Sequence, residues 1–378
     1  MISASTQQAI NKCLRLGIPF AVFAFPGKND IHFIAGNVSD ADDNIAADIF
    51  NDISGEYGFV INPFGIGHEN RIVISGSMSE FEIINMPDSV DKCDYCPITP
   101  DESTDYDSYK SQIERIVDWH KTYGGKTVLS RIVSIESCKS PADVIDSYFS
   151  EFPNCFRHAY FTSKTGFWIG ATPELLLDYT LSSNTAITMS LAGTRKAGDS
   201  AADWDGKNTR EHDIVTDYIC EAFMRNGLNP EVSLGQQLPF GEIEHLCHVI
   251  TAQGAVDVDR LLLDLSPTPA VCGYPRAHAL NMITSMEKHR RTCYGGYIGV
   301  IQPDKIRLFV NLRCASVTEL PNSGFLYTLY GGGGITAESN SESEWIETAY
   351  KMSRLYRIIT GDNGLASLIY PLNTNLRD

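Results

Sequence analysis

The sequence has few basic residues for its length. Its 378 residues include 30 Lys and Arg against 47 Asp and Glu, which gives a net charge of −17 at pH 7. A protein that binds nucleic acid needs a basic surface to neutralise the phosphate backbone, and no cluster of Lys and Arg interrupts the acidic background. The charge balance therefore excludes nucleic acid as a partner.

The sequence also lacks a long apolar segment, and a membrane-spanning helix needs about 20 consecutive apolar residues. The apolar stretch LGIPFAVFAF (16–25) runs into the turn-forming residues PGKND, and a second apolar run, IHFIAG (31–36), follows. This pattern predicts a β-hairpin, and no small-residue cleavage site marks a signal peptide. We therefore expect a cytoplasmic protein with no membrane contact.

Closely spaced cysteines are scarce, although the chain contains ten cysteines. The one close pair is Cys93 and Cys96, and a structural zinc site would need a second pair or suitably spaced histidines. The segment EHLCH (244–248) has no partner cluster. Reduced and mostly buried thiols are expected, as in a cytoplasmic protein.

The glycine-rich segment GGGGIT (331–336) lacks the residues of a nucleotide site. A phosphate-binding loop needs Lys and then Ser or Thr after its last glycine, whereas Gly334 is followed by Ile335 and Thr336. The dinucleotide-binding pattern fails because Thr336 occupies the place of its third glycine. No nucleotide is expected, and a glycine-rich strand end is an open alternative to a ligand-binding turn.

Short strands that follow one another between helices are present along most of the chain. Strands adjacent in sequence favour antiparallel pairing with helices packed outside, which is an α+β fold. Periodicity predicts strands at residues 20–25, 31–35, 59–62, 71–75, 81–84, 126–136, 157–163, 166–170, 175–179, within 297–317 and at 324–330. It predicts helices at 109–123, 141–152, 208–226, 275–291 and 341–360, and a polar loop or linker at 87–107.

Two of these helices carry carboxylates in informative places. Ser341 and Glu344 form a capping-box pattern, and Glu344, Glu347 and Lys351 share a helix face distinct from the apolar one. Glu211 falls within the apolar stripe of the other helix, where burial of its charge is costly unless a cation compensates it. Mg²⁺ binds one or two protein carboxylates in such sites. The alternative for Glu344 and Glu347 is a solvated helix face, and the alternative for Glu211 is a first helical turn open to water.

Eight motifs, in order along about residues 105–360, resemble those of the chorismate-utilising enzymes. They are KTVLSR (126–131), GATPELLL (170–177), LAGTRKAG (191–198), LSPTPAVCGYP (265–275), YGGYIG (294–299), LRC (312–314), GGI (333–335) and EWIETAYK (344–351). The resemblance implies one domain over residues 1–378, with two antiparallel sheets flanked by helices and a Mg²⁺-dependent site. Residues 1–100 would contribute strands to the same fold.

The resemblance also assigns roles to individual residues. It implies that Glu211 and Glu347 bind Mg²⁺, with Glu344 acting through water. Arg313 and Lys351 would bind substrate carboxylates. The alternative for Arg313 is an ordinary ion pair on the sheet surface, and the alternative for Lys351 is an i,i+4 pair with Glu347. The other implied substrate contacts are Gly193, Thr194, His245, Ala270 and the backbone amides of Gly333 and Gly334. A plain hairpin turn and a core histidine are the alternatives for Gly193, Thr194 and His245.

Members of the family differ in what attacks the ring of chorismate. Lys126 matches the lysine of the members that use water, and Ala270 stands where salicylate synthases have threonine. The pattern resembles the isochorismate synthases, with Ser266 as a departure from a common histidine. The alternatives are a salicylate synthase and a non-catalytic chorismate-binding regulator. Because water would be the nucleophile, no glutaminase subunit is expected. A monomer would suffice for the reaction. The product would serve menaquinone or siderophore synthesis.

The reaction needs a base on one face of the ring and an acid on the other. Lys126 would be the base, and because an unperturbed lysine has a pKa of about 10.4 it requires desolvation or a positive neighbour. Glu174, at a bend after Pro173, would be the acid and requires a raised pKa. An edge-strand lysine and an exposed turn glutamate are the alternatives.

Overall fold

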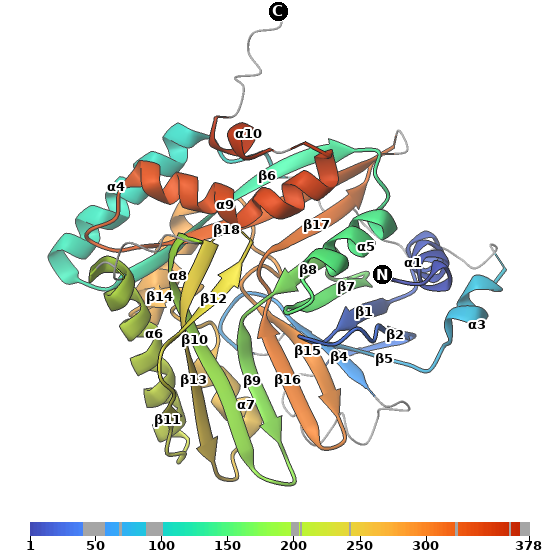
Figure 1. Cartoon of the computed structure of the whole chain (residues 1–378), viewed down its shortest axis with the longest axis horizontal. Coiled ribbons are helices and arrows are strands. Elements are labelled where there is room, and N and C mark those ends of the chain that lie inside the picture. The colour runs from blue at the N-terminus through green and yellow to red at the C-terminus, as the bar shows by residue number, and fades with distance from the viewer. Residues whose placement is uncertain are drawn as a thin grey trace, which may run out of the picture.

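A computed structural model of the chain describes residues 1–40, 57–67, 70–87, 101–197, 204, 206–241, 243–321, 324–362 and 364–370. Two antiparallel sheets face each other, and helices cover their outer surfaces (Figure 1). None of the helices in the described ranges is both long and apolar enough to span a membrane. The two-sheet α+β architecture agrees with the sequence-based expectation.

The first sheet has eight strands. Their spatial order is β14 (Gly273–Tyr274), β6 (Lys126–Ser137), β18 (Phe325–Ile335), β17 (Cys314–Glu319), β8 (Gly166–Thr172), β7 (Phe156–Thr162), β1 (Phe20–Ala24) and β2 (His32–Ala35). The predicted N-terminal hairpin is therefore present as β1 and β2, which pair antiparallel from Phe20 opposite Ala35 to Phe23 opposite His32.

The second sheet has ten strands. Its order is β11 (Glu231–Val232), β13 (Ile243–Gln253), β10 (Thr185–Lys196), β9 (Leu175–Thr180), β16 (Lys305–Val310), β15 (Tyr297–Gln302), β4 (Gly58–Asn62), β5 (Ile72–Ser75) and β3 (Asn37–Asp40), with β12 (Gln236–Phe240) paired to β13. Strands from the first 100 residues thus contribute to both sheets.

Alternating side chains of the first sheet fill two different cores, as expected for strands buried on both faces. Phe156, Tyr160 and Trp168 point toward the second sheet, where the rings of Phe156 and Phe309 stack at 4.3 Å. Residues of the opposite parity, such as Ala159 and Phe161, pack against helices.

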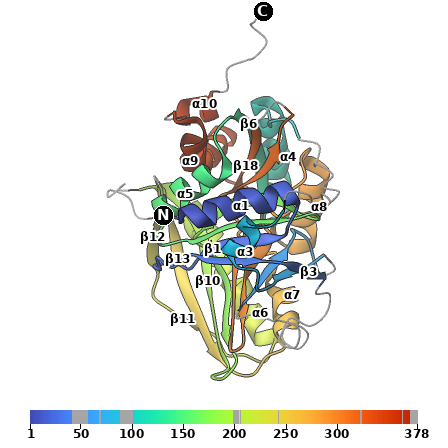
Figure 2. The same cartoon turned by 90° about the vertical axis from the view of Figure 1, so that its right-hand side faces the viewer.

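The helices form three groups around the sheets. α1 (Ala4–Leu16), α5 (Pro141–Glu151) and α9 (Ser341–Thr360) cover the first sheet. α6 (Gly206–Arg225) and α7 (Val258–Leu265) cover the second, toward the end of the molecule away from α9 and α10 (Leu365–Ile369) (Figure 2). α4 (Tyr106–Tyr123) packs beside β6 and α9, and α8 (Arg276–Met286) beside β6.

One predicted strand is wrong, because residues 81–84 belong to the short helix α3 (Glu80–Ile84). Ser79 accepts a hydrogen bond from the backbone of Glu82, whose carboxylate in turn accepts from the backbone of Ser79. This capping box satisfies backbone groups at the start of a helix, and it outweighs the short apolar run that suggested a strand. The helices α1 and α7 and the strands β10 and β13 were not predicted either.

Two other predictions fall partly outside the described residues. Cys93 and Cys96 are outside them, as is most of the polar segment 87–107. The eight cysteines in the described ranges have free thiols, and six of them are buried.

Candidate active site

The pocket lies where the chain crosses from one sheet to the other. β8 of the first sheet continues into β9 of the second through Pro173 and Glu174, and β16 of the second continues into β17 of the first through residues 311–313. Because β8 pairs with β17 and β9 with β16, the two crossovers are neighbours. The backbone N–H of Val310 donates to the carbonyl of Glu174 at 3.0 Å, which ties the two crossovers together.

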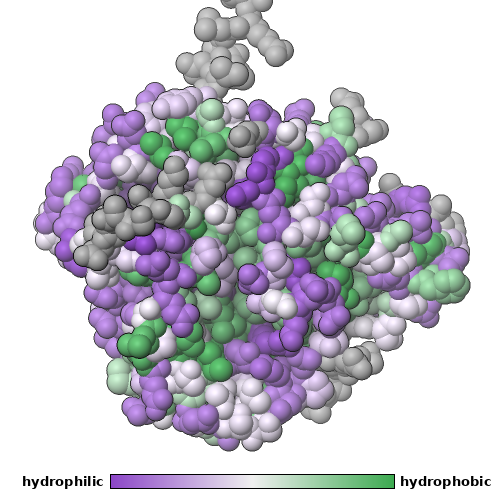
Figure 3. All heavy atoms as spheres, viewed as in Figure 1, coloured by the Kyte–Doolittle hydropathy of each residue, from purple (hydrophilic) through white to green (hydrophobic). Residues whose placement is uncertain are grey.

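The middle of the face in Figure 3 is hollowed, with apolar surface at its floor and hydrophilic residues around it. A pocket of about 50 Å³ is found between the two sheets. Nine of the predicted site residues line it: Glu174, Gly193, Thr194, Glu211, His245, Ala270, Arg313, Gly334 and Lys351. Lys126, Gly333, Glu344 and Glu347 do not line the pocket. Lys126 and Glu347 are paired to the lining residues Glu211 and Lys351.

Glu174 is buried at the crossover, and only 3% of its surface is exposed. Burial raises the pKa of its carboxyl to about 8, partly offset by the positive charges of Lys126, Arg313 and Lys351. A carboxylic acid with this pKa keeps its proton at neutral pH and can donate it. The exposed turn glutamate that was the alternative for Glu174 is therefore wrong.

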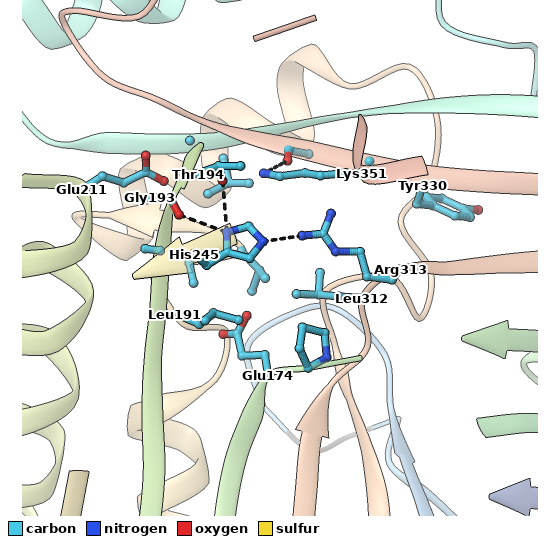
Figure 4. Close-up of a pocket in the computed structure, with 18 of the residues that line it drawn as sticks. Glu174, Leu191, Gly193, Thr194, Glu211, His245, Leu312, Arg313, Tyr330 and Lys351 are labelled. Carbon is cyan, nitrogen blue, oxygen red and sulfur yellow. Dashed lines mark hydrogen bonds between the residues drawn. The ribbon is translucent and has the colours of Figure 1, made fainter. Parts of the chain in front are cut away.

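His245 connects Gly193 and Thr194 to Arg313 (Figure 4). Gly193 and Thr194 do not form the predicted turn, because they lie at an irregularity within strand β10. Its Nδ1 lies 3.0 Å from the carbonyl oxygen of Gly193 and 3.2 Å from Oγ1 of Thr194, while its Nε2 lies 2.8 Å from Nη2 of Arg313. Because arginine can only donate, Nε2 accepts and Nδ1 carries the proton. Burial, with the charges of Arg313 and Lys351, lowers the pKa of His245 to about 3, so the ring is neutral.

Arg313 brings a buried positive charge to the pocket. Besides its bond to His245, the guanidinium lies over the ring of Phe240, 4.8 Å from its centroid. Its Nε has no hydrogen-bond partner within the described part of the chain. A buried cation with an unused donor is suited to bind an anion, and the surface ion pair that was the alternative for Arg313 is wrong.

Three glutamates near the pocket each lie against a lysine. Nζ of Lys126 is 2.9 Å from Glu211, Nζ of Lys351 is 2.6 Å from Glu347, and Nζ of Lys207 is 2.6 Å from Glu344. The pair of Lys351 and Glu347 is the i,i+4 pair that was the alternative for Lys351, yet Lys351 also lines the pocket and donates to the carbonyl of Gly332 at 2.8 Å.

On α9, Glu344 is buried and Glu347 is half-buried, and each carboxyl group affects the pKa of the other or shares a lysine with it. Burial and the charge of Glu347 raise the pKa of Glu344, although Lys207 opposes the shift. Burial also acts to raise the pKa of Glu347, but Lys351 and Lys207 hold it well below its ordinary value. The solvated helix face that was the alternative for these acids is wrong.

Lys126 only partly meets the requirement for a base. It is fully buried, as the desolvation argument demands, and β6 starts at this residue. Its close neighbour is the carboxylate of Glu211, however, and not a positive group. A Cβ at Gly334 would lie 2.7 Å from Cε of Lys126 and would collide with Oε1 of Glu211, so the absence of a side chain at Gly334 makes room for this pair beside the pocket.

The space needed at Gly334 also explains the run of glycines, whose predicted conformation was a turn. Gly331 to Gly334 do not form a turn; they lie within β18, opposite Arg131 to Val128 of β6. A Cβ at Gly333 would lie 2.8 Å from Oε2 of Glu344. The strand alternative is correct, and the glycines provide space for the charged side chains of α6, α9 and β6.

The predicted capping box of Ser341 and Glu344 is also wrong. Asn340 is the N-cap of α9, and its side chain accepts from the backbone N–H of Ser343 at 3.0 Å. Glu344 instead accepts from Lys207 and from the hydroxyl of Ser339. Lys207 was not predicted as a site residue, although its position four residues before Glu211 on one helix was a signal.

The carboxylates fit a bound divalent cation chemically. Lys207 lies among Glu344, Glu347 and Glu211, and although burial opposes its charge, these three acids raise its pKa. Oxygen ligands from carboxylates suit Mg²⁺, and the lysine shows that they already stabilise a cation there. In the described ranges, no three acidic, histidine or cysteine side chains lie close enough to form a ready metal site.

The chain was compared with known proteins. The model of a family described as chorismate binding enzyme matches residues 74–360. The chain is 31% identical over 216 residues to isochorismate synthase MenF of Escherichia coli (strain K12), covering 54% of this chain and 48% of that protein. It is 28% identical over 245 residues to 2-amino-4-deoxychorismate synthase of Streptomyces globisporus, covering 61% and 48%.

The solved structure of MenF, titled as the menaquinone-specific isochorismate synthase from Escherichia coli, has a TM-score of 0.72 with this chain at 20% identity. It covers 95% of this chain and 92% of the MenF chain, which confirms the fold. In sequence, the matched region spans about half the length of the curated relatives. Since the family match extends over most of the chain and over the pocket, this protein belongs to the chorismate binding enzyme family.

Proposed function

We propose that the protein is an isochorismate synthase, which converts chorismate reversibly into isochorismate with Mg²⁺. The observation that carries the proposal is Glu174, a carboxylic acid held in its protonated form beside the buried cation Arg313. A pocket that offers both a proton and positive charge suits a dicarboxylate from which a hydroxyl group must leave. The similarity to named isochorismate synthases supports the same activity.

In the proposed reaction, water attacks C2 of the chorismate ring while the hydroxyl group leaves C4. Lys126 accepts the proton of the attacking water, and Glu174 donates its proton to the departing hydroxyl, which leaves as water. The ring double bonds shift between these two carbons, so no atoms are gained or lost overall. The reverse reaction uses the same two groups with their proton roles exchanged.

The remaining lining residues bind and orient the substrate. Arg313 and Lys351 provide positive charge for its carboxylates, in a protein whose net charge of −17 would otherwise repel a dianion. His245 holds the guanidinium of Arg313, and Thr194 adds a hydroxyl beside that histidine. The apolar part of the lining includes Val128, Leu191 and Ala270, which would pack against the ring.

Glu211 and Glu347 would hold the Mg²⁺ ion, with Glu344 acting through water. When bound, the ion would neutralise these acids and attract a carboxylate of the substrate. Because water is the nucleophile, no glutaminase subunit is needed to supply ammonia, and we propose that the chain acts alone.

The test is to incubate the protein with chorismate and Mg²⁺ in the absence of ammonia and to identify the products. Isochorismate without pyruvate is expected. Stoichiometric pyruvate with salicylate would identify a salicylate synthase instead. Binding of chorismate without any product would identify a non-catalytic chorismate-binding protein.

A further inference from the structure

Arg313 has an unusual backbone conformation. Its φ of +50° lies in the left-handed region, where residues other than glycine, asparagine and aspartate are uncommon. The conformation occurs at the crossover from β16 to β17, where the chain changes sheets. Non-glycine residues held in this region cluster at functional sites and persist only when their surroundings hold them there.

Tyr148 is a group that holds this backbone in place. Its hydroxyl donates to the carbonyl oxygen of Arg313 at 2.8 Å, and the backbone N–H of Ala171 approaches the same oxygen at 3.3 Å. Tyr148 belongs to α5, is almost fully buried and does not line the pocket. It can therefore influence a ligand only through Arg313.

The same helix end also supports the side chain of Arg313. The ring of Phe152, just after the end of α5, stacks on Phe240 at 4.5 Å with an angle of 7° between the planes. Phe240 in turn lies beneath the guanidinium of Arg313, and the rings of Tyr148 and Phe152 meet edge to face at 5.0 Å. Backbone and guanidinium are thus both held from the α5 side, and the side chain extends toward His245 (Figure 4).

We propose that Tyr148 is a positioning residue for substrate binding, because its hydroxyl keeps Arg313 in the left-handed conformation that aims the guanidinium into the pocket. The proposal rests on the proposed function, since it takes Arg313 as the anchor of a chorismate carboxylate. The proton-transferring groups, Lys126 and Glu174, have no hydrogen bond to Tyr148. Loss of the hydroxyl should therefore weaken binding and leave the chemical step unchanged.

The experiment compares two matched variants, Tyr148→Phe and Tyr327→Phe. Both tyrosines are buried in the same apolar cluster, and each donates its hydroxyl to a backbone carbonyl, which for Tyr327 is that of Lys139 at 2.7 Å. Each variant keeps the ring and loses one hydrogen bond, so both should lower the Tm by a similar amount. Of the two tyrosines, only Tyr148 donates its hydroxyl to Arg313, the proposed anchor of a substrate carboxylate.

Chorismate affinity is measured by titration calorimetry in Mg²⁺-containing buffer, and kcat and KM are measured for the same proteins. Tyr148→Phe is expected to raise Kd and KM about tenfold, the effect of one lost hydrogen bond, with kcat kept within about twofold of wild type. Tyr327→Phe should leave all three constants unchanged.

Equal Kd values for the two variants would overturn the role of Tyr148 while leaving the proposed function in place. A loss of kcat equal to the loss of kcat/KM in Tyr148→Phe would also overturn it, since the hydroxyl would then act on the transition state alone. A wild-type protein that fails to bind chorismate would overturn the proposed function, and the role of Tyr148 with it.

Discussion

The two walls of the pocket differ in how they treat buried charge. On the lysine–glutamate wall (Lys126, Lys207, Glu211, Glu344, Glu347 and Lys351), of which Glu211 and Lys351 line the pocket and the others stand outside its lining, each acid lies within 2.9 Å of an ammonium group. On the crossover wall (Glu174, His245 and Arg313), the acid is protonated, the histidine is neutral and the guanidinium has an unused donor.

The lysine–glutamate wall can exchange its cations, whereas the crossover wall is rigid. A lysine carries its charge as a compact ammonium group at the end of a flexible side chain. The side chain can therefore move away and leave its place beside a carboxylate to another cation. The crossover wall is fixed by backbone hydrogen bonds between neighbouring strands, such as those to the carbonyl groups of Glu174 and Arg313, and no ion pair joins Glu174 to Arg313, both of which lie in the described ranges. We infer that the lysine–glutamate wall receives the metal, while the crossover wall presents the proton donor and the anion site.

The largest effect is expected at Glu211, the acid of the lysine–glutamate wall that also lines the pocket. Glu211→Gln keeps the shape of the side chain and removes the charge needed to hold Mg²⁺, so activity at ordinary Mg²⁺ should fall to background while the circular dichroism spectrum stays unchanged. Calorimetric titration with Mg²⁺ should show the loss directly. Full activity of this variant in EDTA-treated buffer would contradict the metal assignment.

Lys126→Ala should slow the reaction by about 10²- to 10⁴-fold, the usual contribution of a general base. By microscopic reversibility the forward and reverse rates should fall together, because the same group serves both directions. Chorismate binding should persist, since Arg313 and Lys351 are the residues proposed to bind the carboxylates. A loss of affinity in proportion to the loss of rate would make Lys126 a substrate anchor instead.

Gly334→Ala tests whether β18 must lack side chains beside the pocket. The added methyl group would collide with Glu211 and crowd Lys126, and a displacement of about 1 Å at such a site can cost about 100-fold in rate. Gly324→Ala is the matched control, since a Cβ there meets nothing closer than 3.6 Å. Equal activity of the two variants would show that the glycines have no role in the site.

Periodicity and motif spacing predicted most of the fold, and the failures have physical reasons. β6 was predicted closely because its segment is rich in β-branched residues, and α9 because its apolar residues recur at helical spacing. The helix α3 was missed because a capping box, not periodicity, determines it. Residues 331–334 were predicted as a turn because glycines suggest one. Their lack of side chains instead makes room for side chains of α9, which follows, and of α6 and β6, which are distant in sequence.

Most of the site residues were predicted, but not their partners. Glu174 was expected to need a raised pKa, and burial at a crossover provides it. The pairing of Lys207 with Glu344 joins residues 137 positions apart, which no local pattern reveals. The left-handed backbone conformation of Arg313 could not be predicted from the sequence either. It depends on the path of the chain between two sheets and on a hydroxyl group of α5.

The smallest expected effect concerns the stability of the crossover wall. Burial raises the pKa of Glu174 to about 8, above its ordinary value of 4.5 in the unfolded chain. Between these two values the folded protein keeps a proton that the unfolded chain has lost. The stability that the raised pKa contributes is therefore complete below about pH 4.5 and declines as the pH rises to about 8.

Glu174→Gln removes this dependence, because the amide does not titrate and has nearly the same shape. The Tm of the variant relative to wild type should therefore increase by a few degrees between pH 6 and pH 8.5, measured by differential scanning calorimetry without ligands. Glu319→Gln, a change at an exposed position near the end of β17, should show no such trend. A constant difference between Glu174→Gln and wild type over this range would mean that Glu174 is ionised in the folded protein, and the crossover wall would then have no proton to donate.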